Sequence, residues 1–196
     1  QLVDVGTFVL GIQQLVIGLA IGFVSMMVLN TFVLAGQVIA MQTGLGFASI
    51  VDPVNGINVP AVGQFYLILA TLLFWTLDGH LSMIQMIVMS FHAFPVGEAW
   101  WSAEQFQSIA HWGGWMFVSA LTLSLAPIVS LLIVNLAFGV MTKAAPQLNI
   151  FSIGFSIAQV MGLFIIWITL DNFTAHFETQ WYRAEQFMCQ LLRICP

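Results

Sequence analysis

Apolar residues fill most of the chain, and polar residues interrupt them at only a few places. The apolar stretches follow one another at 1–43, 61–92, 101–142 and 150–195. Stretches of this kind exceed the roughly 20 apolar residues that a helix needs to cross a membrane. The pattern therefore predicts an all-α membrane protein of long, kinked helices and helical hairpins, with 1–196 forming a single helical domain.

The longest break between apolar stretches is the segment 44–60. Asp52-Pro53 and Asn55-Gly56 are turn dipeptides, and the glycines and prolines of this segment oppose a continuous helix. The segment is nevertheless too apolar for an ordinary solvated loop, since it contains Leu45, Phe47, Ile50 and Val51. An irregular backbone with apolar side chains must lie in protein or in a confined space. The sequence therefore predicts a functional loop at 44–60.

A second break divides the apolar stretch at 61–92 into two halves. Asp78, Gly79 and His80 stand near its middle. A charge at bilayer depth is costly, and glycine is a poor residue for a helix interior. We expect a broken helix or hairpin, with helices at about 61–77 and 81–92. The Asp78 carboxylate either caps the second helix or takes part in a polar contact such as a proton relay.

The third stretch, at 101–142, is expected to begin with a capping box. Ser102 would be the N-cap residue, and the Gln105 side chain would reach back to it. Pro127 is expected to kink the helix that follows. Gly18 and Gly22 form a GxxxG motif within 1–43, which indicates a close contact with another helix.

A turn at 143–149 separates the third stretch from the last one. Lys143 suits the end of a helix, Pro146 stops that helix, and Asn149 can cap the next one. The last stretch, at 150–195, is expected to continue into an amphipathic C-terminal helix. Apolar residues recur there every three or four positions, at Phe173, Phe177, Trp181, Ala184, Met188 and Leu191.

Composition supports the membrane class. The chain is 60% hydrophobic and 6% charged, whereas soluble domains carry about a quarter charged residues. The net charge of −5 and the lack of a basic patch argue against a nucleic-acid partner. The two cysteines match no zinc or redox motif, so we expect unpaired packing residues. The chain begins at Gln1 without a signal-peptide pattern, so we expect an N-terminal part to be missing.

The sequence offers no catalytic constellation. No nucleophile elbow lies near Asp78 and His80, the four histidines lack metal-ligand spacing, and there is no P-loop or dinucleotide fingerprint. We therefore expect no enzyme, no metal and no cofactor. One alternative is a secondary transporter, or a fragment of one, with a midplane site at Asp78–His80. An intramembrane enzyme that uses Asp78 or the histidines is a weaker alternative.

Several motifs in a fixed order resemble the FliR family. They are QTGLGFASIVDP at 42–53, NVP at 58–60, LDGHL at 77–81, SFH at 90–92 and AAPQLNIFSIGF at 144–155. The likeness extends from about residue 8 to about residue 170. Members of this family are the R subunit of the flagellar type III export gate, and virulence secretion systems have a homologous subunit.

The resemblance implies a non-enzymatic subunit, present in one copy, of a helical, ring-like assembly. Its partners would be several copies each of the P and Q subunits, the B-type switch subunit and membrane lipid. Unfolded flagellar proteins would cross the inner membrane through this complex, within the flagellar basal body. The family also has a helical segment before the part that matches this chain.

The resemblance further implies that the loop at 44–60 plugs the lumen of the pore, with Phe47 and Ile50 as obstructing side chains. The plug residues carried over are Gly44, Leu45, Gly46, Phe47, Ile50, Val51, Asp52, Pro53, Gly56 and Pro60. The turn with Lys143, Pro146, Gln147 and Asn149 would lie at the cytoplasm-proximal entrance.

Overall fold

Two long helices, each followed by a bent pair of helices that runs back along it, make up the fold. The structure is a computed structural model that describes residues 5–51, 56, 58–96, 101–144 and 150–194. The first unit comprises α1 (Val5–Thr43), the 3-10 turn η1 (Leu45–Phe47), strands β1 (Ser49–Val51) and β2 (Asn58–Pro60), and helices α2 (Ala61–Thr76) and α3 (Gly79–Ala93). The second comprises α4 (Ala103–Ala144), α5 (Ile150–Thr169), η2 (Leu170–Asn172) and α6 (Phe173–Leu191).

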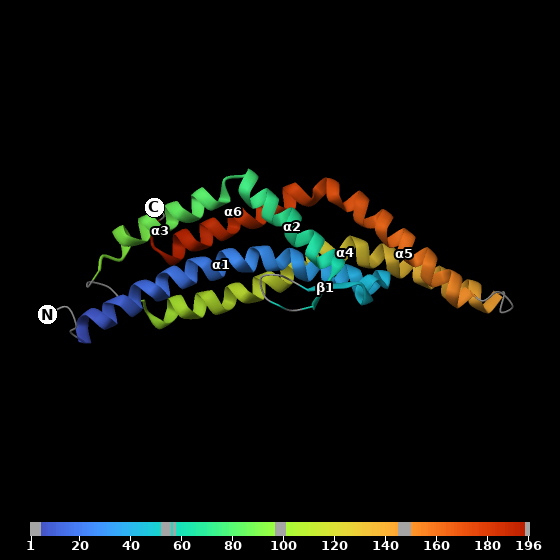
Figure 1. The fold of residues 1–196 in the computed structure, drawn as a ribbon, viewed down its shortest axis with the longest axis horizontal. Helices are drawn as coiled ribbons and strands as arrows, with labels where there is room; N and C mark the ends of the chain where they lie inside the picture. The colour runs from blue at the N-terminus through green and yellow to red at the C-terminus, as the bar shows by residue number, and fades with distance from the viewer. Residues whose placement is uncertain (1–4, 52–55, 57, 97–100, 145–149, 195–196) are drawn as a thin grey trace.

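Helices α1 and α4 run side by side in the same direction, and α2–α3 and α5–α6 return in the opposite direction (Figure 1). The predicted all-α class with long helices and a bent pair is confirmed. Among the described residues, three helical stretches, at 6–43, 103–144 and 156–191, are long and apolar enough to cross a membrane. The bent pair α2–α3 would be a fourth such span, with an angle of 66° at its break.

The core forms where α6 packs on α1. The Phe32 side chain is fully buried, and its ring centroid lies 5.0 Å from that of Phe173 and 5.6 Å from that of Phe177. Tyr66 of α2 makes an edge contact with Phe173 at 5.3 Å. All six predicted apolar positions of α6 are buried. Burying a large apolar side chain is worth about 1.5–3 kcal/mol, so this stripe holds α6 against the long helix.

The start of α4 is tied to the end of α6. The Ser102 backbone N–H donates to Gln105 Oε1 at 2.6 Å, which is the reach-back bond expected of the capping box. Gln105 Nε2 also donates to the Leu191 carbonyl at 3.4 Å. Further along α4, the rings of Trp112 and Phe187 stack with a centroid separation of 4.5 Å. Helix α4 then continues through Pro127 as one helix.

The backbones of α1 and α2 approach each other closely at Gly36 and Gly63, and this contact does not involve the GxxxG motif. A Cβ built on Gly36 would lie 2.7 Å from the Gly63 Cα, and one on Gly63 would lie 3.2 Å from the Val33 carbonyl oxygen. Gly18 and Gly22 have nothing within 4 Å of such a Cβ. The expected tight contact at Gly18 and Gly22 is therefore absent from the described part of the chain. The expectation of unpaired cysteines is also wrong for Cys189, which is disulfide-bonded.

We predict that Gly36→Ala destabilises the detergent-solubilised chain by about 1–3 kcal/mol, because the new methyl group would overlap the backbone of α2. Gly18→Ala is the matched control in the same helix. It should leave the stability unchanged or raise it by up to about 1 kcal/mol, since alanine is the better helix former. Unfolding by SDS titration measures both variants. Equal effects of the two substitutions would contradict the close approach of α1 and α2.

Candidate functional site

Helix α1 ends at Thr43, and the residues that end it lead the chain into the 44–60 loop. The Thr43 hydroxyl donates to the Ala40 carbonyl at 3.0 Å and accepts from the Leu45 N–H at 3.4 Å. Gly44 follows with φ 74°, in the left-handed region where glycine avoids the steric cost of a side chain. The Ala48 N–H then donates to the Leu45 carbonyl at 3.0 Å, which closes η1. The sequence of Thr43 and Gly44 thus ends the helix and turns the chain sharply.

The loop is less irregular than predicted, because a short antiparallel ribbon closes its base. Strand residues pair as Ser49 with Pro60, Ile50 with Val59, and Val51 with Asn58. The Ala61 N–H donates to the Ala48 carbonyl at 2.7 Å and extends the ribbon into α2. Asn58–Pro60 is therefore a strand, within a segment that was expected to have an irregular backbone. Pairing satisfies backbone groups that an apolar environment would leave without partners.

The side chains of the loop differ widely in burial. Val59 is 2% exposed, and its side chain packs close to Gly63 of α2. Ile50 is 51% exposed, and Phe47 is 92% exposed, the largest value among the described large apolar side chains. The base of the loop is thus anchored while Phe47 projects away from the rest of the chain. Gly56 has φ 68°, which again favours glycine, whereas Asp52 and Pro53 lie outside the described residues.

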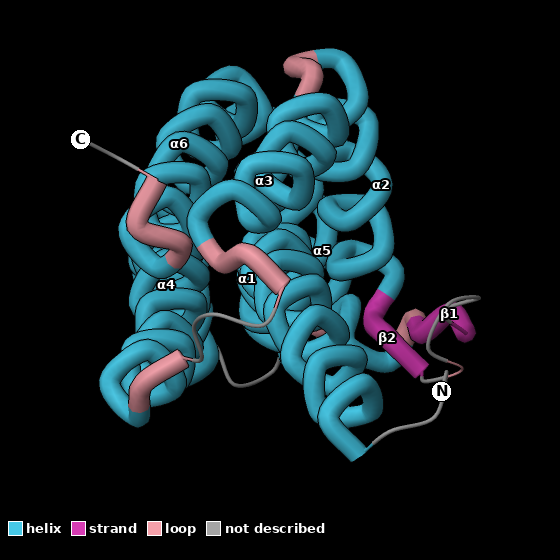
Figure 2. Tube along the Cα trace, turned by 90° about the vertical axis from the view of Figure 1, so that its left-hand side faces the viewer, coloured by secondary structure: helices cyan, strands magenta, loops and turns pink. Residues whose placement is uncertain are grey.

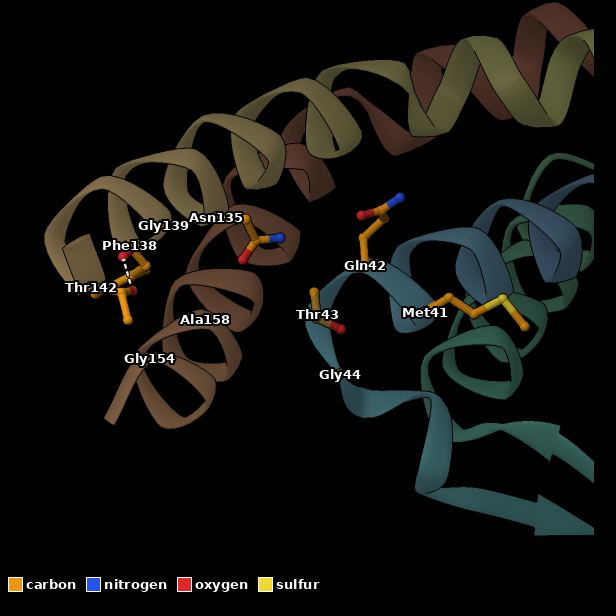
Figure 3. A pocket seen from close by; sticks show the side chains of 10 residues that line it. All are labelled: Met41, Gln42, Thr43, Gly44, Asn135, Phe138, Gly139, Thr142, Gly154 and Ala158. Atoms are coloured by element: carbon orange, nitrogen blue, oxygen red, sulfur yellow. Dashed lines mark hydrogen bonds between the residues drawn. The ribbon is translucent and has the colours of Figure 1, made fainter. Parts of the chain in front are cut away.

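An open pocket of about 400 Å³ lies beside the root of the loop, between the end of α1, α4 and α5 (Figure 3). Four polar side chains contribute to its lining: Gln42, Thr43, Asn135 and Thr142. The Thr142 hydroxyl is bonded to the Phe138 carbonyl at 2.6 Å, so it is satisfied within its own helix. The sequence analysis did not predict this pocket. The residue that could have indicated it is Asn135, an amide within the charge-free stretch 105–142.

A second pocket, of about 390 Å³, lies between the loop root and α5. Apolar residues line it: Leu45, Ala48, Ala61, Val62, Phe65, Leu163, Ile166, Trp167 and Leu170. Between the two pockets, α5 packs closely against the end of α1, because a Cβ on Gly162 would overlap the Thr43 side chain. The loop root therefore contacts α5 tightly at Thr43 and is loosely packed elsewhere.

The second predicted site is the bend between α2 and α3. Asp78 is exposed and adopts φ 56°, with its backbone carbonyl accepting from Leu81 N–H at 2.9 Å and Ser82 N–H at 3.1 Å. Its side chain makes no capping bond, so the expected carboxylate cap is wrong. The backbone makes the turn, and Gly79 is required because a Cβ there would lie 2.6 Å from the Phe74 ring.

His80 points to aromatic neighbours. Its ring centroid lies 4.5 Å from that of Trp75, and its Nδ1 is buried without a hydrogen-bond partner among the described residues. Glu185 of α6 accepts a hydrogen bond from the Ser82 hydroxyl, so the carboxylate that steadies the start of α3 comes from the second unit. This contact joins residues 103 positions apart and left no signal in the sequence.

No other candidate constellation emerges. Within the described ranges there is no group of three or more His, Cys, Asp or Glu side chains that could hold a metal ion. Lys143 lies in the last turn of α4, as predicted, and is exposed. Pro146, Gln147 and Asn149 lie outside the described residues.

Long apolar helices and a broken helix pair define a helical membrane protein, and its anchored apolar loop at 44–60 is the candidate site. The chain belongs to the FliR family, because the family described as bacterial export proteins, family 1, matches residues 2–184. It is 38% identical over 154 residues to the flagellar biosynthetic protein FliR of Escherichia coli K12, covering 79% of this chain and 59% of the relative. The corresponding protein of Pectobacterium carotovorum is 39% identical over 159 residues, covering 81% and 61%.

A virulence-type relative is also similar. The surface presentation of antigens protein SpaR of Shigella flexneri is 24% identical over 172 residues, covering 85% of this chain and 66% of the relative. The chain spans about three fifths of the length of the two FliR relatives. The family is one of export proteins and not of enzymes.

We predict that Gly162→Ala destabilises the chain by about 1–3 kcal/mol, because the added methyl group would meet the Thr43 side chain. Thr43→Gly removes that obstacle. Gly162→Ala should therefore cost much less stability in the Thr43→Gly chain than in the wild-type chain. A double-mutant cycle of unfolding free energies measures this coupling. Additive losses would show that α5 does not press on the loop root.

We predict that Asp78→Asn changes the unfolding free energy by less than about 0.5 kcal/mol, because the carboxylate caps nothing. Asp78→Val should cost about 1–2 kcal/mol, since a β-branched side chain is strained at positive φ. Thermal unfolding in detergent compares the two. A large loss in Asp78→Asn would mean that the carboxylate, and not the backbone, holds the bend.

Proposed function

We propose that the chain is a non-enzymatic subunit of the flagellar type III export gate, in the bacterial inner membrane within the flagellar basal body. It forms part of the pore through which unfolded flagellar proteins cross, and the loop at 44–60 plugs the lumen. The observation that carries this proposal is the exposure of Phe47, 92%, on a loop whose base is anchored. Membership of the export family and similarity to flagellar biosynthetic proteins support it.

The physical case for a plug rests on the contrast between Phe47 and Val59. The Phe47 ring, in the 3-10 turn next to the anchored ribbon, finds no apolar environment among the described residues of its own chain. In a narrow lumen, such side chains exclude water and ions by making the passage too apolar to stay hydrated. The lumen and the neighbouring subunits would supply the environment that the chain lacks.

Opening requires that part of the loop moves while its base stays attached. The ribbon pairs and the Gly36–Gly63 contact hold the base on the α2 side. Gly44 and Gly56, both at positive φ, are the positions where the backbone changes direction most freely. We propose that the 3-10 turn η1, which carries Phe47 and lies between Gly44 and strand β1, swings toward the loosely packed side of the root, next to α5, when a substrate enters.

The partners proposed are the P and Q subunits, the B-type switch subunit, unfolded export substrates and membrane lipid. The turn with Lys143, Pro146, Gln147 and Asn149 is proposed to lie at the cytoplasm-proximal entrance. The exposed apolar side chains on both long helices support assembly with other apolar surfaces, because a soluble monomer does not leave so many uncovered.

The alternative function is a secondary transporter with an ion or substrate site at the bend. The 66° break with Asp78 at its tip is the feature that favours it. Under this alternative, Asp78→Asn would abolish coupled transport in membranes. Under the gate proposal, the Asp78→Asn variant still assembles and exports, because Phe47 and not Asp78 closes the lumen of the pore.

We predict that Phe47→Ser makes the assembled complex leak ions and small solutes, because a small polar side chain would let water fill the constriction. Phe8→Ser is the control, since Phe8 is also strongly exposed, at 72%, but stands near the start of α1. Conductance of complexes reconstituted in planar bilayers measures the leak. An assembled Phe47→Ser complex that stays as tight as the wild type would refute the plug role.

A further inference from the structure

The apolar pocket of about 390 Å³ between the loop root and α5 lies next to the turn that carries Phe47. We call it the η1 pocket. The described residues that line it are all apolar, and they come from the loop root, α2, α5 and η2. Leu45 and Ala48, two of these lining residues, stand on either side of Phe47 in the sequence, and Phe47 itself does not line the pocket. The pocket therefore opens beside a turn whose aromatic side chain points away from it.

The η1 pocket suits an aromatic side chain in size and in chemistry. Small-molecule pockets begin at about 300 Å³, so a space of about 390 Å³ has room for one phenyl ring. Val62 and Ile166, each 7% exposed, form its inner wall. Leu163 is 55% exposed and stands at its edge. An aromatic ring gains more from such an apolar enclosure than a smaller side chain does, because it removes more surface from water.

Proximity favours Phe47 over any other occupant of the pocket. Consecutive Cα atoms are about 3.8 Å apart, and the next residue, Ale48, already lines the pocket. A group that is tethered at a site has a high effective concentration there. A lipid chain or a side chain of another molecule would have to compete with a ring that is always present.

The turn that carries Phe47 is lightly held. None of the three residues of η1 is buried. The Leu45 N–H reaches the Thr43 hydroxyl at 3.4 Å, which is long for a hydrogen bond, and the Ala48 N–H donates to the Leu45 carbonyl within the turn at 3.0 Å. Hydrogen bonds of a 3-10 turn also have poorer geometry than those of an α-helix. Little has to break for η1 to change its direction.

The ribbon that follows the turn can stay in place while η1 rotates. The Ala61 N–H donates to the Ala48 carbonyl at 2.7 Å, so the anchored part begins directly after Phe47. Gly44, at φ 74°, is the pivot before the turn. Strands β1 and β2 stand on the outside of the helix bundle, next to α2 (Figure 2). A rotation between these two points therefore displaces no helix.

From these observations we infer that the η1 pocket receives the Phe47 side chain when the gate opens. The ring then exchanges one apolar environment, the closed lumen, for another, so opening does not leave it in water. The inference rests on the proposed function, because that function makes Phe47 the obstructing side chain. It adds the place to which the ring moves and the residues that receive it.

The first test makes the pocket smaller within the whole complex, in which the chain is co-expressed with the P and Q subunits. Leu163→Trp adds bulk at the pocket edge. Ile168→Trp is the matched control, since Ile168 is 49% exposed on the same helix and does not line the pocket. Leu163→Trp should lower secretion of a flagellar export substrate by about tenfold or more, without raising the leak of the closed complex. Wild-type secretion by Leu163→Trp, or an equal loss in the control, overturns the inference.

A double variant shows whether residue 47 is the occupant. Phe47→Leu gives this position a smaller apolar side chain, which a reduced pocket can still receive. Phe47→Leu/Leu163→Trp should therefore secrete within about threefold of Phe47→Leu alone, which is the coupling expected of two side chains in contact. If the pocket held a lipid chain or a substrate side chain instead, Leu163→Trp would lower secretion equally in both backgrounds. Equal losses overturn the inference.

Photo-crosslinking locates the side chain directly and does not depend on how the Leu163→Trp variant folds. Benzoylphenylalanine replaces Phe47, and complexes are irradiated either empty or with an export substrate stalled by a folded fusion domain. Adducts with the segment 163–170, identified by mass spectrometry, should rise by about tenfold with the stalled substrate, as a minor state becomes the major one. The same adducts in both samples, or adducts with lipid or substrate alone, overturn the inference.

The leak and the secretion separate the two proposals. If Phe47→Ser leaves the assembled complex tight, the proposed function fails and the inference fails with it. If Phe47→Ser leaks while Leu163→Trp secretes like its control, the inference fails and the proposed function stands.

Discussion

The contact between Gly36 and Gly63 is the constraint on which the rest of the structure depends. It brings the backbones of α1 and α2 together with no space for a side chain, directly behind the 44–60 loop. Because the two helices meet there, the loop between them must leave and return within a short distance. The paired strands are the economical solution, since they satisfy the backbone groups of a loop whose side chains are apolar.

An anchored base changes what the loop can do. A fully irregular loop would lose its position together with its contacts, whereas this one keeps Val59 buried and presents Phe47 outward. The free side of the root faces α5, where open pockets flank the tight contact of Thr43 with Gly162. Rigid anchoring on one side and loose packing on the other suit the proposed plug, which would have to hold a seal and also release it.

The same division between tight and open packing recurs at the scale of the whole chain. Helix α6 buries its apolar stripe against α1 and closes one side of the long helices. Elsewhere on α1, Gly18 and Gly22 have open space beside them, since a Cβ built on either would meet nothing within 4 Å. A subunit of an assembly is expected to look like this, because its fold needs only part of its surface and its neighbours need the rest.

Helix positions, the break at Asp78–Gly79, the capping box at Ser102 and the stripe on α6 followed from the sequence alone, since they depend on local periodicity, backbone preference and apolar length. The sequence also singled out the 44–60 loop and, through its motifs, the family. Only the tertiary structure decided which glycines lie at a helix contact, that the base of the loop is a ribbon, and that Glu185 steadies the start of α3. These features join residues distant along the chain, and a local pattern carries no record of which helix will become a neighbour.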